Sequence, residues 1–307
     1  MRMQRNSLRA RFALALVALM TINTLASDQD GYRASMEKWR AEREAELQAD
    51  DGWLTLVGLF WLKDGANRFG TDATNEIVLP ERSAPPRAGV LEFHEGRTTL
   101  RMENSASVTV NGKPVTSADL QTDEKQKPDV VRLGSLVIII IKRGARYGVR
   151  VRDLNSKGRR EFKGMRWFPV QEAYRITATF VAYEQPKDIE IANVLGDVSK
   201  QPSPGYAVFT LDGKEYRLEP MLEGKDKLFF VFGDLTNNKT TYGAGRFLYA
   251  DLPKDGHVTL DFNQAVNPPC AFTPFATCPL PPRQNRLKVA IEAGELNYHS
   301  PSPSTAR

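Results

Sequence analysis

The clearest fold signal in the chain is a hairpin sequence, Tyr206-Ala207-Val208-Phe209-Thr210-Leu211-Asp212-Gly213-Lys214-Glu215-Tyr216-Arg217-Leu218-Glu219. Apolar and polar residues alternate on both sides of Asp212-Gly213, which predicts two strands that each bury one face. Asp and Gly tolerate the positive φ angles that a two-residue turn requires. We therefore expect an antiparallel hairpin here, within a mainly β protein.

Similar runs fill the chain beyond Gly52, with turn residues about every 8–12 positions, the spacing of a sandwich or barrel. Glu95-Gly96 and Asn111-Gly112 predict two more hairpin turns. We expect a first β-sandwich domain over residues 51–155, with strands at Trp53–Leu62, Glu76–Leu79, Val90–His94, Arg97–Met102, Ser107–Val110, Val130–Leu133, Leu136–Lys142 and Tyr147–Asp153. After a polar linker, we expect a second β domain over residues 165–298, a sandwich or barrel, with strands at Ala173–Tyr183, Tyr206–Leu211, Glu215–Glu219, Lys227–Phe232, Thr240–Tyr249 and His257–Phe262.

Residues 27–50 predict a helix that precedes both domains. Tyr32, Met36 and Trp39 fall on one face of it, and Gly52 lies just past its end. The other faces carry charged residues. We expect the apolar stripe to pack the helix onto the β domain that follows it.

Residues 1–26 have the pattern of a secretory signal peptide. Four arginines and no acidic residue precede an apolar run from Phe12 to Met20, and small residues end at Ala26. The run is far shorter than the roughly 20 residues that span a bilayer, and no later segment is longer and as apolar. Cleavage after Ala26 should release a periplasmic or secreted protein without a membrane insertion. The alternative is that the leader stays uncleaved and anchors the protein in the membrane. The Ser- and Pro-rich tail, residues 299–307, is expected to be disordered.

Loss of the leader changes the charge balance. It lowers the formal charge from +5 (42 basic and 37 acidic residues) to +1 (38 and 37). A chain so close to neutral gives no support to nucleic-acid binding, which requires a concentrated basic surface. Only two cysteines and three histidines are present, a poor inventory for zinc. We expect neither a metal nor a cofactor, and the sequence leaves the oligomeric state open.

The first β domain resembles the forkhead-associated sandwich. The resemblance rests on Asn67-Arg68-Phe69-Gly70, then Asn75-Glu76-Ile77-Val78-Leu79, then Val108-Thr109-Val110-Asn111-Gly112-Lys113-Pro114-Val115. The Ser and His with which that family reads phosphothreonine have no counterpart between Leu79 and Val90. The resemblance therefore implies the architecture and not the phosphopeptide activity.

A second resemblance covers nearly all of the chain after the leader. It rests on Thr241-Tyr242-Gly243-Ala244-Gly245-Arg246-Phe247-Leu248, Leu260-Asp261-Phe262-Asn263, Asn267-Pro268-Pro269-Cys270-Ala271-Phe272, Cys278-Pro279-Leu280-Pro281-Pro282, Asn285-Arg286-Leu287 and Glu292-Ala293-Gly294-Glu295. Gly52-Trp53-Leu54, Gly58-Leu59 and Trp167-Phe168-Pro169 add earlier blocks. These motifs are similar to those of the family called domain of unknown function 1684, which implies no activity and assigns no functional residue.

The same region gathers the residues that could form a site. No phosphate-binding loop, nucleophile elbow, zinc motif or dinucleotide fingerprint is present. The candidate ligand-binding residues are Tyr242, Arg246, Asp261, Asn263, Asn267, Asn285 and Arg286. An arginine among them could hold a carboxylate or phosphate in a bidentate way. Alternatively, the asparagines and arginines pin a proline-rich loop, and Asp261 pairs with Arg246.

Cys270 and Cys278, eight positions apart in an exported chain, predict a disulfide, with two buried thiols as the alternative. Catalysis by Cys270 would need a histidine base, and His257 lies in a polar turn. We expect a non-catalytic cell-envelope protein that binds a small anionic or polar ligand, or a partner, in its second β domain. The alternatives are an envelope hydrolase and a purely structural role for the C-terminal block.

Overall fold

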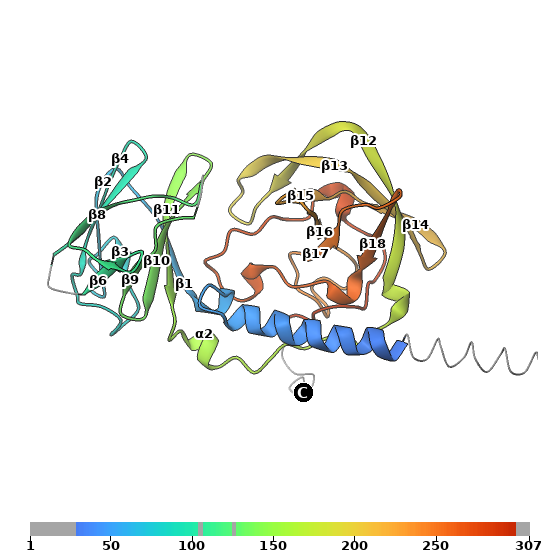
Figure 1. The fold of residues 1–307 in the computed structure, drawn as a ribbon, viewed down its shortest axis with the longest axis horizontal. Helices are drawn as coiled ribbons and strands as arrows, with labels where there is room; N and C mark the ends of the chain where they lie inside the picture. The colour runs from blue at the N-terminus through green and yellow to red at the C-terminus, as the bar shows by residue number, and fades with distance from the viewer. Residues whose placement is uncertain (1–28, 104–106, 125–126, 299–307) are drawn as a thin grey trace, which may run out of the picture.

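The computed structural model describes residues 29–298, except 104–106 and 125–126. Figure 1 shows two β-rich bodies side by side and a helix that runs along the second. The predicted fold class, mainly β with one N-terminal helix, is confirmed. The expected leader, residues 1–26, and the expected tail, residues 299–307, lie outside the described residues.

The first body, here called the N-terminal sandwich, consists of two sheets that enclose one aliphatic core. One sheet has the order β1-β11-β10-β9-β6-β7 and the other β3-β2-β4-β5-β8. The strands are β1 (Leu56–Trp61), β2 (Gly65–Gly70), β3 (Ile77–Val78), β4 (Gly89–His94), β5 (Arg97–Met102), β6 (Val108–Val110), β7 (Lys113–Pro114), β8 (Ser117–Leu120), β9 (Val131–Leu133), β10 (Leu136–Arg143) and β11 (Arg146–Asp153). A 3-10 turn, η1 (Trp53–Thr55), precedes β1, and a short helix, α2 (Lys157–Arg160), follows β11.

The predicted tight turns are present. Glu95 and Gly96 connect β4 to β5, and Asn111 connects β6 to β7 with φ of +52°. Asp212 and Gly213, with φ of +52° and +71°, connect the hairpin that first indicated the β class. These residue types were decisive because few others adopt positive φ without strain.

The second body, here called the C-terminal half, runs from β12 to residue 298 and also contains two sheets. One has the order β14-β13-β12-β18 and the other β15-β16-β17. Their strands are β12 (Arg175–Ala192), β13 (Val198–Leu211), β14 (Lys214–Leu218), β15 (Met221–Glu223), β16 (Lys227–Phe232), β17 (Arg246–Asp251) and β18 (His257–Asp261). Short 3-10 turns occur at η2 (Glu172–Tyr174), η3 (Phe262–Gln264), η4 (Pro269–Ala271) and η5 (Arg283–Asn285). Phe209 of one sheet, Phe230 of the other and Phe262 of η3 belong to the shared core.

One predicted strand is too long. The run Thr240–Tyr249 becomes strand only at Arg246. Side chains fold the preceding residues into a turn instead, since Asn237 Nδ2 donates to the hydroxyl of Thr241 at 3.0 Å and to the carbonyl of Tyr242 at 2.8 Å. Gly245 then adopts a φ of +109° with the Phe232 carbonyl and Pro281 close by, so no larger residue fits.

The sequence predicted that the helix, residues 29–48, packs on the sandwich that follows it. The structure places it on the C-terminal half instead. Trp39 contacts Trp167 edge to face with ring centroids 5.7 Å apart, and Arg40 Nη2 donates to the Phe168 carbonyl at 2.8 Å. Arg43 pairs with the buried Glu295 at 3.0 Å. The helix therefore docks on the C-terminal half, because its polar side chains as well as its apolar stripe find partners there.

The outer face of the sandwich meets the C-terminal half through β1 and β11 (Figure 1). On β11, Val149 and Val151 point into the sandwich core. Alternation along a strand directs Arg150 and Arg152 to the opposite face. The C-terminal half covers that face: the Thr273 hydroxyl, for example, donates to the Leu56 carbonyl at 3.0 Å.

Candidate functional site

Arg246, the central residue of the predicted site, is fully buried and bound to the protein itself. Its Nη2 donates to Asp234 Oδ2 at 2.6 Å and to the Ile291 carbonyl at 2.9 Å. Its Nη1 donates to the Ala293 carbonyl. The acidic partner is Asp234 and not Asp261, the partner that the sequence suggested. The contacts that would hold a ligand are thus occupied by residues of the same chain.

The asparagines of the predicted site pin backbone, as the structural alternative proposes. Asn285 accepts from the Glu219 amide at 2.8 Å and donates to the Glu219 carbonyl at 2.8 Å. Asn263 makes the same pair of bonds with Gln171, at 3.0 and 2.8 Å. Asn267 Nδ2 donates to the Leu296 carbonyl at 2.8 Å. Each asparagine ties together segments that are distant in the sequence.

The remaining predicted residues do not converge on one concavity. Tyr242 donates its hydroxyl proton to the Cys270 carbonyl at 3.2 Å, and Arg286 is exposed beside η5. Asp261 lies elsewhere, at the end of β18. Of the seven predicted residues, only Asp261 and Asn263 share a hydrogen-bonded cluster, and Tyr32 of the helix completes it.

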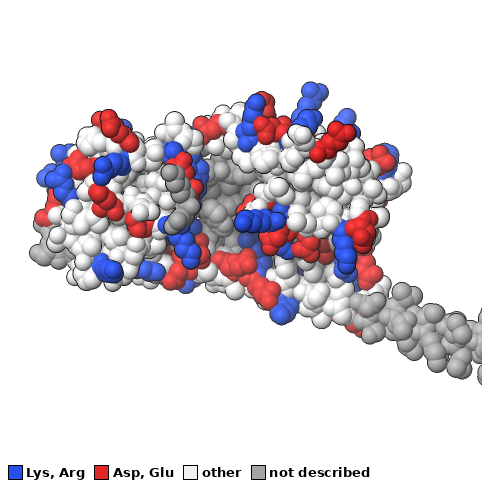
Figure 2. All heavy atoms as spheres, turned by 45° about the horizontal axis from the view of Figure 1, so that its top comes forward, with Lys and Arg blue, Asp and Glu red and all other residues white. Residues whose placement is uncertain are grey.

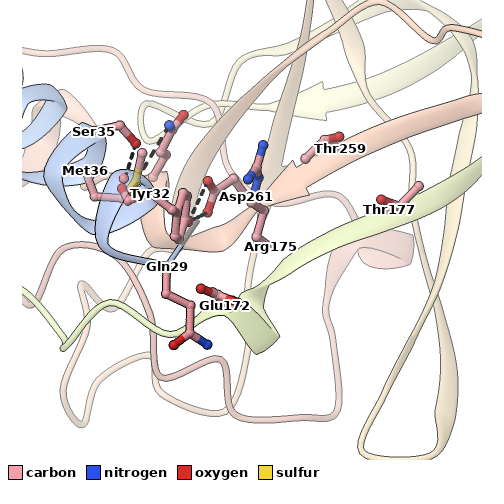
Figure 3. Close-up of a pocket in the computed structure, with 11 residues that line it drawn as sticks. Gln29, Tyr32, Ser35, Met36, Glu172, Arg175, Thr177, Thr259 and Asp261 are labelled. Atoms are coloured by element: carbon pink, nitrogen blue, oxygen red, sulfur yellow. Dashed lines mark hydrogen bonds between the residues drawn. The ribbon is translucent and has the colours of Figure 1, made fainter. Parts of the chain in front are cut away.

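That cluster borders a cavity of about 700 Å³ at the N-terminal end of the described helix. Figure 3 shows Tyr32 pointing from the helix toward Asp261, with Arg175 of β12 beside them. The Tyr32 oxygen lies 2.8 Å from both carboxylate oxygens of Asp261. Burial and the hydrogen bond to Asp261 raise the pKa of Tyr32, so this hydroxyl stays protonated and acts as a donor.

The charged groups of this cavity either form hydrogen bonds with neighbouring side chains and backbone or are exposed to water. Asp261 also accepts from the amide and side chain of Asn263, each at 3.1 Å. The exposed Arg175 guanidinium stacks over the Tyr32 ring at 5.0 Å. The cavity is polar, but nothing in its geometry requires a ligand, and its main polar network attaches the helix.

A second cavity of about 500 Å³, here called the interdomain cleft, lies between the N-terminal sandwich and the C-terminal half. Figure 2 shows basic and acidic side chains on both halves, next to the boundary between them. The cleft is lined by four aromatic residues and three arginines, with an amide and a thiol among the others: Trp53, Phe229, Phe247, Tyr249, Arg43, Arg143, Arg150, Asn267 and Cys278. The rings of Phe229 and Tyr249 stack with centroids 4.8 Å apart.

Arg150 is the unusual group in the cleft. It is only 8% exposed, yet within the described chain its guanidinium forms no hydrogen bond and no ion pair, and its Nε is a buried donor without an acceptor. The Trp53 ring centroid lies 5.6 Å from its guanidinium carbon. The charge of Asp123 also favours the protonated form of Arg150, although the two residues form no ion pair. Burial, followed by the positive charges of Arg143 and Arg152, lowers the pKa of Arg150 to about 10.

The other two arginines of the cleft have carboxylate partners. Arg143 pairs with Asp123 at 2.8 Å, and Arg43 pairs with Glu295. Asn267 adds a second unsatisfied atom, because its buried Oδ1 accepts no hydrogen bond within the described residues. The cleft therefore presents one unpaired cation and one free acceptor among aromatic walls.

Cys270 and Cys278 are both free thiols, so the predicted disulfide is wrong for this structure. The Cys278 sulfur instead accepts from the Cys270 amide at 3.1 Å, and the Cys270 thiol points to the Ala276 carbonyl at 3.6 Å. Hydrogen bonding to Cys270, together with burial, raises the pKa of Cys278, while the same contact lowers the pKa of Cys270. His257 is exposed and contacts the Asp255 carbonyl, away from any thiol contact that the described residues show.

Two further properties concern the described residues as a whole. Within the described ranges, no three His, Cys, Asp or Glu side chains gather closely enough to hold a metal ion. In the same part of the chain, no helix is both long enough and apolar enough to cross a membrane.

Sequence reasoning missed Arg150, although a signal for it exists. In Val149-Arg150-Val151-Arg152 the basic residues alternate with core valines. Alternation alone predicts arginines on an exposed face, where they need no partner. Only the C-terminal half, which contributes Phe229, Phe247 and Tyr249 from strands far along the chain, turns that face into a buried wall.

Comparisons with known proteins bear on the family and the fold. Residues 160–296 match the family model described as "Protein of unknown function (DUF1684)", as the motifs suggested. No curated protein matches the chain. Among solved structures, the chain is similar to an uncharacterized protein of Haloarcula marismortui, with 31% identity, coverage of 46% of this chain and 80% of that one, and a TM-score of 0.37.

Solved forkhead-associated (FHA) domains are also similar to part of the chain. The FHA-2 domain of a Mycobacterium tuberculosis ABC transporter has 30% identity, coverage of 31% of this chain and 80% of that one, and a TM-score of 0.24. The FhaA FHA domain has 22% identity, coverage of 31% of this chain and 97% of that one, and a TM-score of 0.23.

Proposed function

We propose that this chain, which belongs to the DUF1684 family through residues 160–296, is a non-catalytic binder of a small anionic ligand in the interdomain cleft. One observation carries the proposal. Arg150 faces the cleft, is 8% exposed, and has no acidic or hydrogen-bonding partner within the described chain.

The physical reason is the cost of an unpaired buried charge. A guanidinium taken out of water without a partner costs several kcal/mol, so buried charges in proteins are normally paired. A carboxylate or phosphate in the cleft would supply that partner through charge-assisted hydrogen bonds.

The alternatives are less well supported. A hydrolase needs an activated nucleophile, and the thiol in the cleft, Cys278, has a raised pKa. No histidine is among the described residues that line the cleft. A purely structural role suits Arg246, whose two terminal nitrogens bind Asp234 and two backbone carbonyls although its Nε, like that of Arg150, has no acceptor among the described residues. It does not explain why Arg150 has no ion pair within the described chain.

The test is thermal unfolding with simple anions. Sodium acetate and sodium phosphate, compared with chloride at equal ionic strength, should raise the Tm of the wild-type protein. Arg150→Met should abolish the increase, because it removes the cation and keeps a side chain of similar length. Arg175→Met is the matched control: it also removes one positive charge, but from the cavity beside Asp261.

Two outcomes would contradict the proposal. One is an equal Tm increase in the wild type and in Arg150→Met. The other is the absence of any anion-dependent increase in the wild type while the protein is folded by circular dichroism.

We also propose that the protein is exported and acts in the periplasm or outside the cell. The support is the charged, apolar and small order of residues 1–26. N-terminal sequencing of protein from its own host should find Ser27 or a residue within a few positions of it. A mature protein that begins at Met1 or Arg2 would contradict export by this leader.

A further inference from the structure

The interdomain cleft continues into a second, smaller cavity of about 270 Å³. The two cavities share five lining residues, Arg143, Glu223, Phe229, Thr277 and Pro279. They therefore form one elongated groove, with Arg150 lining only the larger part. A small inorganic anion would leave most of this groove empty.

The smaller cavity has an apolar floor. Ile191, Met221 and Phe229 belong to one hydrophobic cluster, and each is buried to more than nine-tenths. Leu222, on the same short strand as Met221, is 39% exposed beside this floor. Polar side chains also line the smaller cavity, namely Asn193, Ser199, Gln201 and Thr277. Among its described lining residues there is no cation other than Arg143, which Asp123 neutralises.

The groove has a positive side chain in its larger cavity and a negative one at the junction of the two cavities. Arg150 lies in the larger cavity, whereas Glu223 lies where the two cavities join and is exposed. Within the described chain Glu223 forms no ion pair, so its negative charge would repel a second anionic group at that position. The groove thus favours one negative charge at the Arg150 end and none at the other.

Resting on the proposed function, we infer that the ligand is an elongated amphipathic molecule with a single anionic head group. Its carboxylate or phosphate pairs with Arg150, and its apolar chain passes Phe229 to reach Ile191 and Met221. Arg150 selects the charge, and the apolar floor selects the length of the chain.

The test is a chain-length series measured by isothermal titration calorimetry on the full mature protein. Acetate, butanoate, hexanoate and octanoate should bind with affinity that rises roughly fourfold for each methylene buried. Octanol, which keeps the chain and lacks the charge, should bind at least tenfold more weakly than octanoate. Octyl phosphate should bind as octanoate does if the head group is interchangeable.

Two neighbouring residues of β13 supply matched variants. Ser199 lines the smaller cavity and pairs with Ile191, so its side chain shares that face of the sheet. Val198 pairs with Ala192 and points to the opposite face. Ser199→Trp should lower octanoate affinity at least tenfold and leave acetate binding unchanged, whereas Val198→Trp should change neither.

The outcomes separate the inference from the proposed function. If acetate and octanoate bind equally well and Arg150→Met abolishes both, the anion site stands and the amphipathic ligand is overturned. If octanoate binds equally well to the wild type and Arg150→Met, the proposed function fails. If no member of the series binds to folded wild-type protein, both fail.

Discussion

Two buried arginines of the same chain illustrate how one residue type serves two roles. Arg246 is completely buried, and its guanidinium donates hydrogen bonds to Asp234 and to two backbone carbonyls. Arg150 is almost as buried, but the described residues give it no hydrogen bond and no ion pair: it lies near the Trp53 ring, Arg143 and Arg152, and the charge of Asp123 acts on it without a direct contact. The difference in partners, and not the burial, separates a structural cation from one suited to a ligand.

For Arg246 we expect a large loss of stability on substitution. Arg246→Met leaves Asp234 buried with its charge uncompensated, which should cost roughly 3–5 kcal/mol. Urea denaturation followed by tryptophan fluorescence measures the change. A loss below about 1 kcal/mol, the level of an exposed ion pair, would show that the pair is not structurally important.

For Arg150 we expect substitution to leave the free energy of unfolding unchanged or to increase it, in contrast to Arg246. Arg150→Met removes a buried charge that no partner offsets, so the ligand-free protein should be as stable as the wild type or more stable, by about 1–3 kcal/mol. The same urea experiment decides this. A clear loss of stability would mean that Arg150 has a structural partner, and the case for a ligand would weaken.

The pH dependence of that difference follows from the lowered pKa of Arg150. The folded-state pKa of about 10 lies below the ordinary value of 12.5, so between these values the unfolded state binds more protons. The destabilising effect of the charged Arg150 is complete below pH 10 and fades as pH rises through it. The stability difference between Arg150→Met and the wild type should therefore shrink above pH 10.

At the level of elements, local sequence predicted the tight turns and many of the strands, but it missed β2, β7, β8 and β15 and the distant halves of β12 and β13. Asp212-Gly213 and Glu95-Gly96 form the predicted turns because positive φ is a local property of those residues. Asn263 and Asn285 pin backbone as their residue type suggested, since one amide satisfies a donor and an acceptor. Their particular partners lie tens of residues away and are fixed only by the packing of the sheets.

Contacts between distant elements were not predictable in this way. The helix was expected on the neighbouring sandwich, but its polar residues bind β18 and the C-terminal segment, more than 220 positions away. An apolar stripe at helical spacing indicates that a face is buried and does not indicate against what. The same limit explains why Arg246 was paired with the wrong aspartate.

The docking of the helix can be tested at Tyr32. Tyr32→Phe removes the hydroxyl donor to Asp261 and the acceptor of Asn263, and it should destabilise the protein by about 1–2 kcal/mol. Ser35→Ala is the matched control on the same helix, because the Ser35 hydroxyl bonds only to the helix backbone at Tyr32. That change should stay within about 0.5 kcal/mol, as for other exposed positions. Equal effects from the two variants would argue against docking through Asp261.

At the scale of the whole molecule, the cleft exists because two bodies with separate cores share one boundary. β11 contributes valines to the sandwich core and Arg150 to the boundary, while β16 and β17 contribute Phe229 and Tyr249 from the other side. Besides the Thr273 hydroxyl, an exposed ion pair between Arg146 and Asp197 joins the halves. Exposed pairs of this kind stabilise little, so a ligand held by both walls would add substantially to the attachment.

This leads to a prediction for hydrogen exchange. Octanoate at about 100 times its Kd should stabilise the bound state by about 2.7 kcal/mol. If the ligand contacts both walls, it stabilises the folded state of both, so the hydrogen-bonded amides of β11 and of β17 should exchange more slowly together. Mass spectrometry of peptides from the two strands measures this, with Arg150→Met as the unliganded control and β7, at the far edge of its sheet, as an internal reference. Slower exchange confined to β17 would place the ligand within the C-terminal half alone, and the cleft would then not be a site shared by the two bodies.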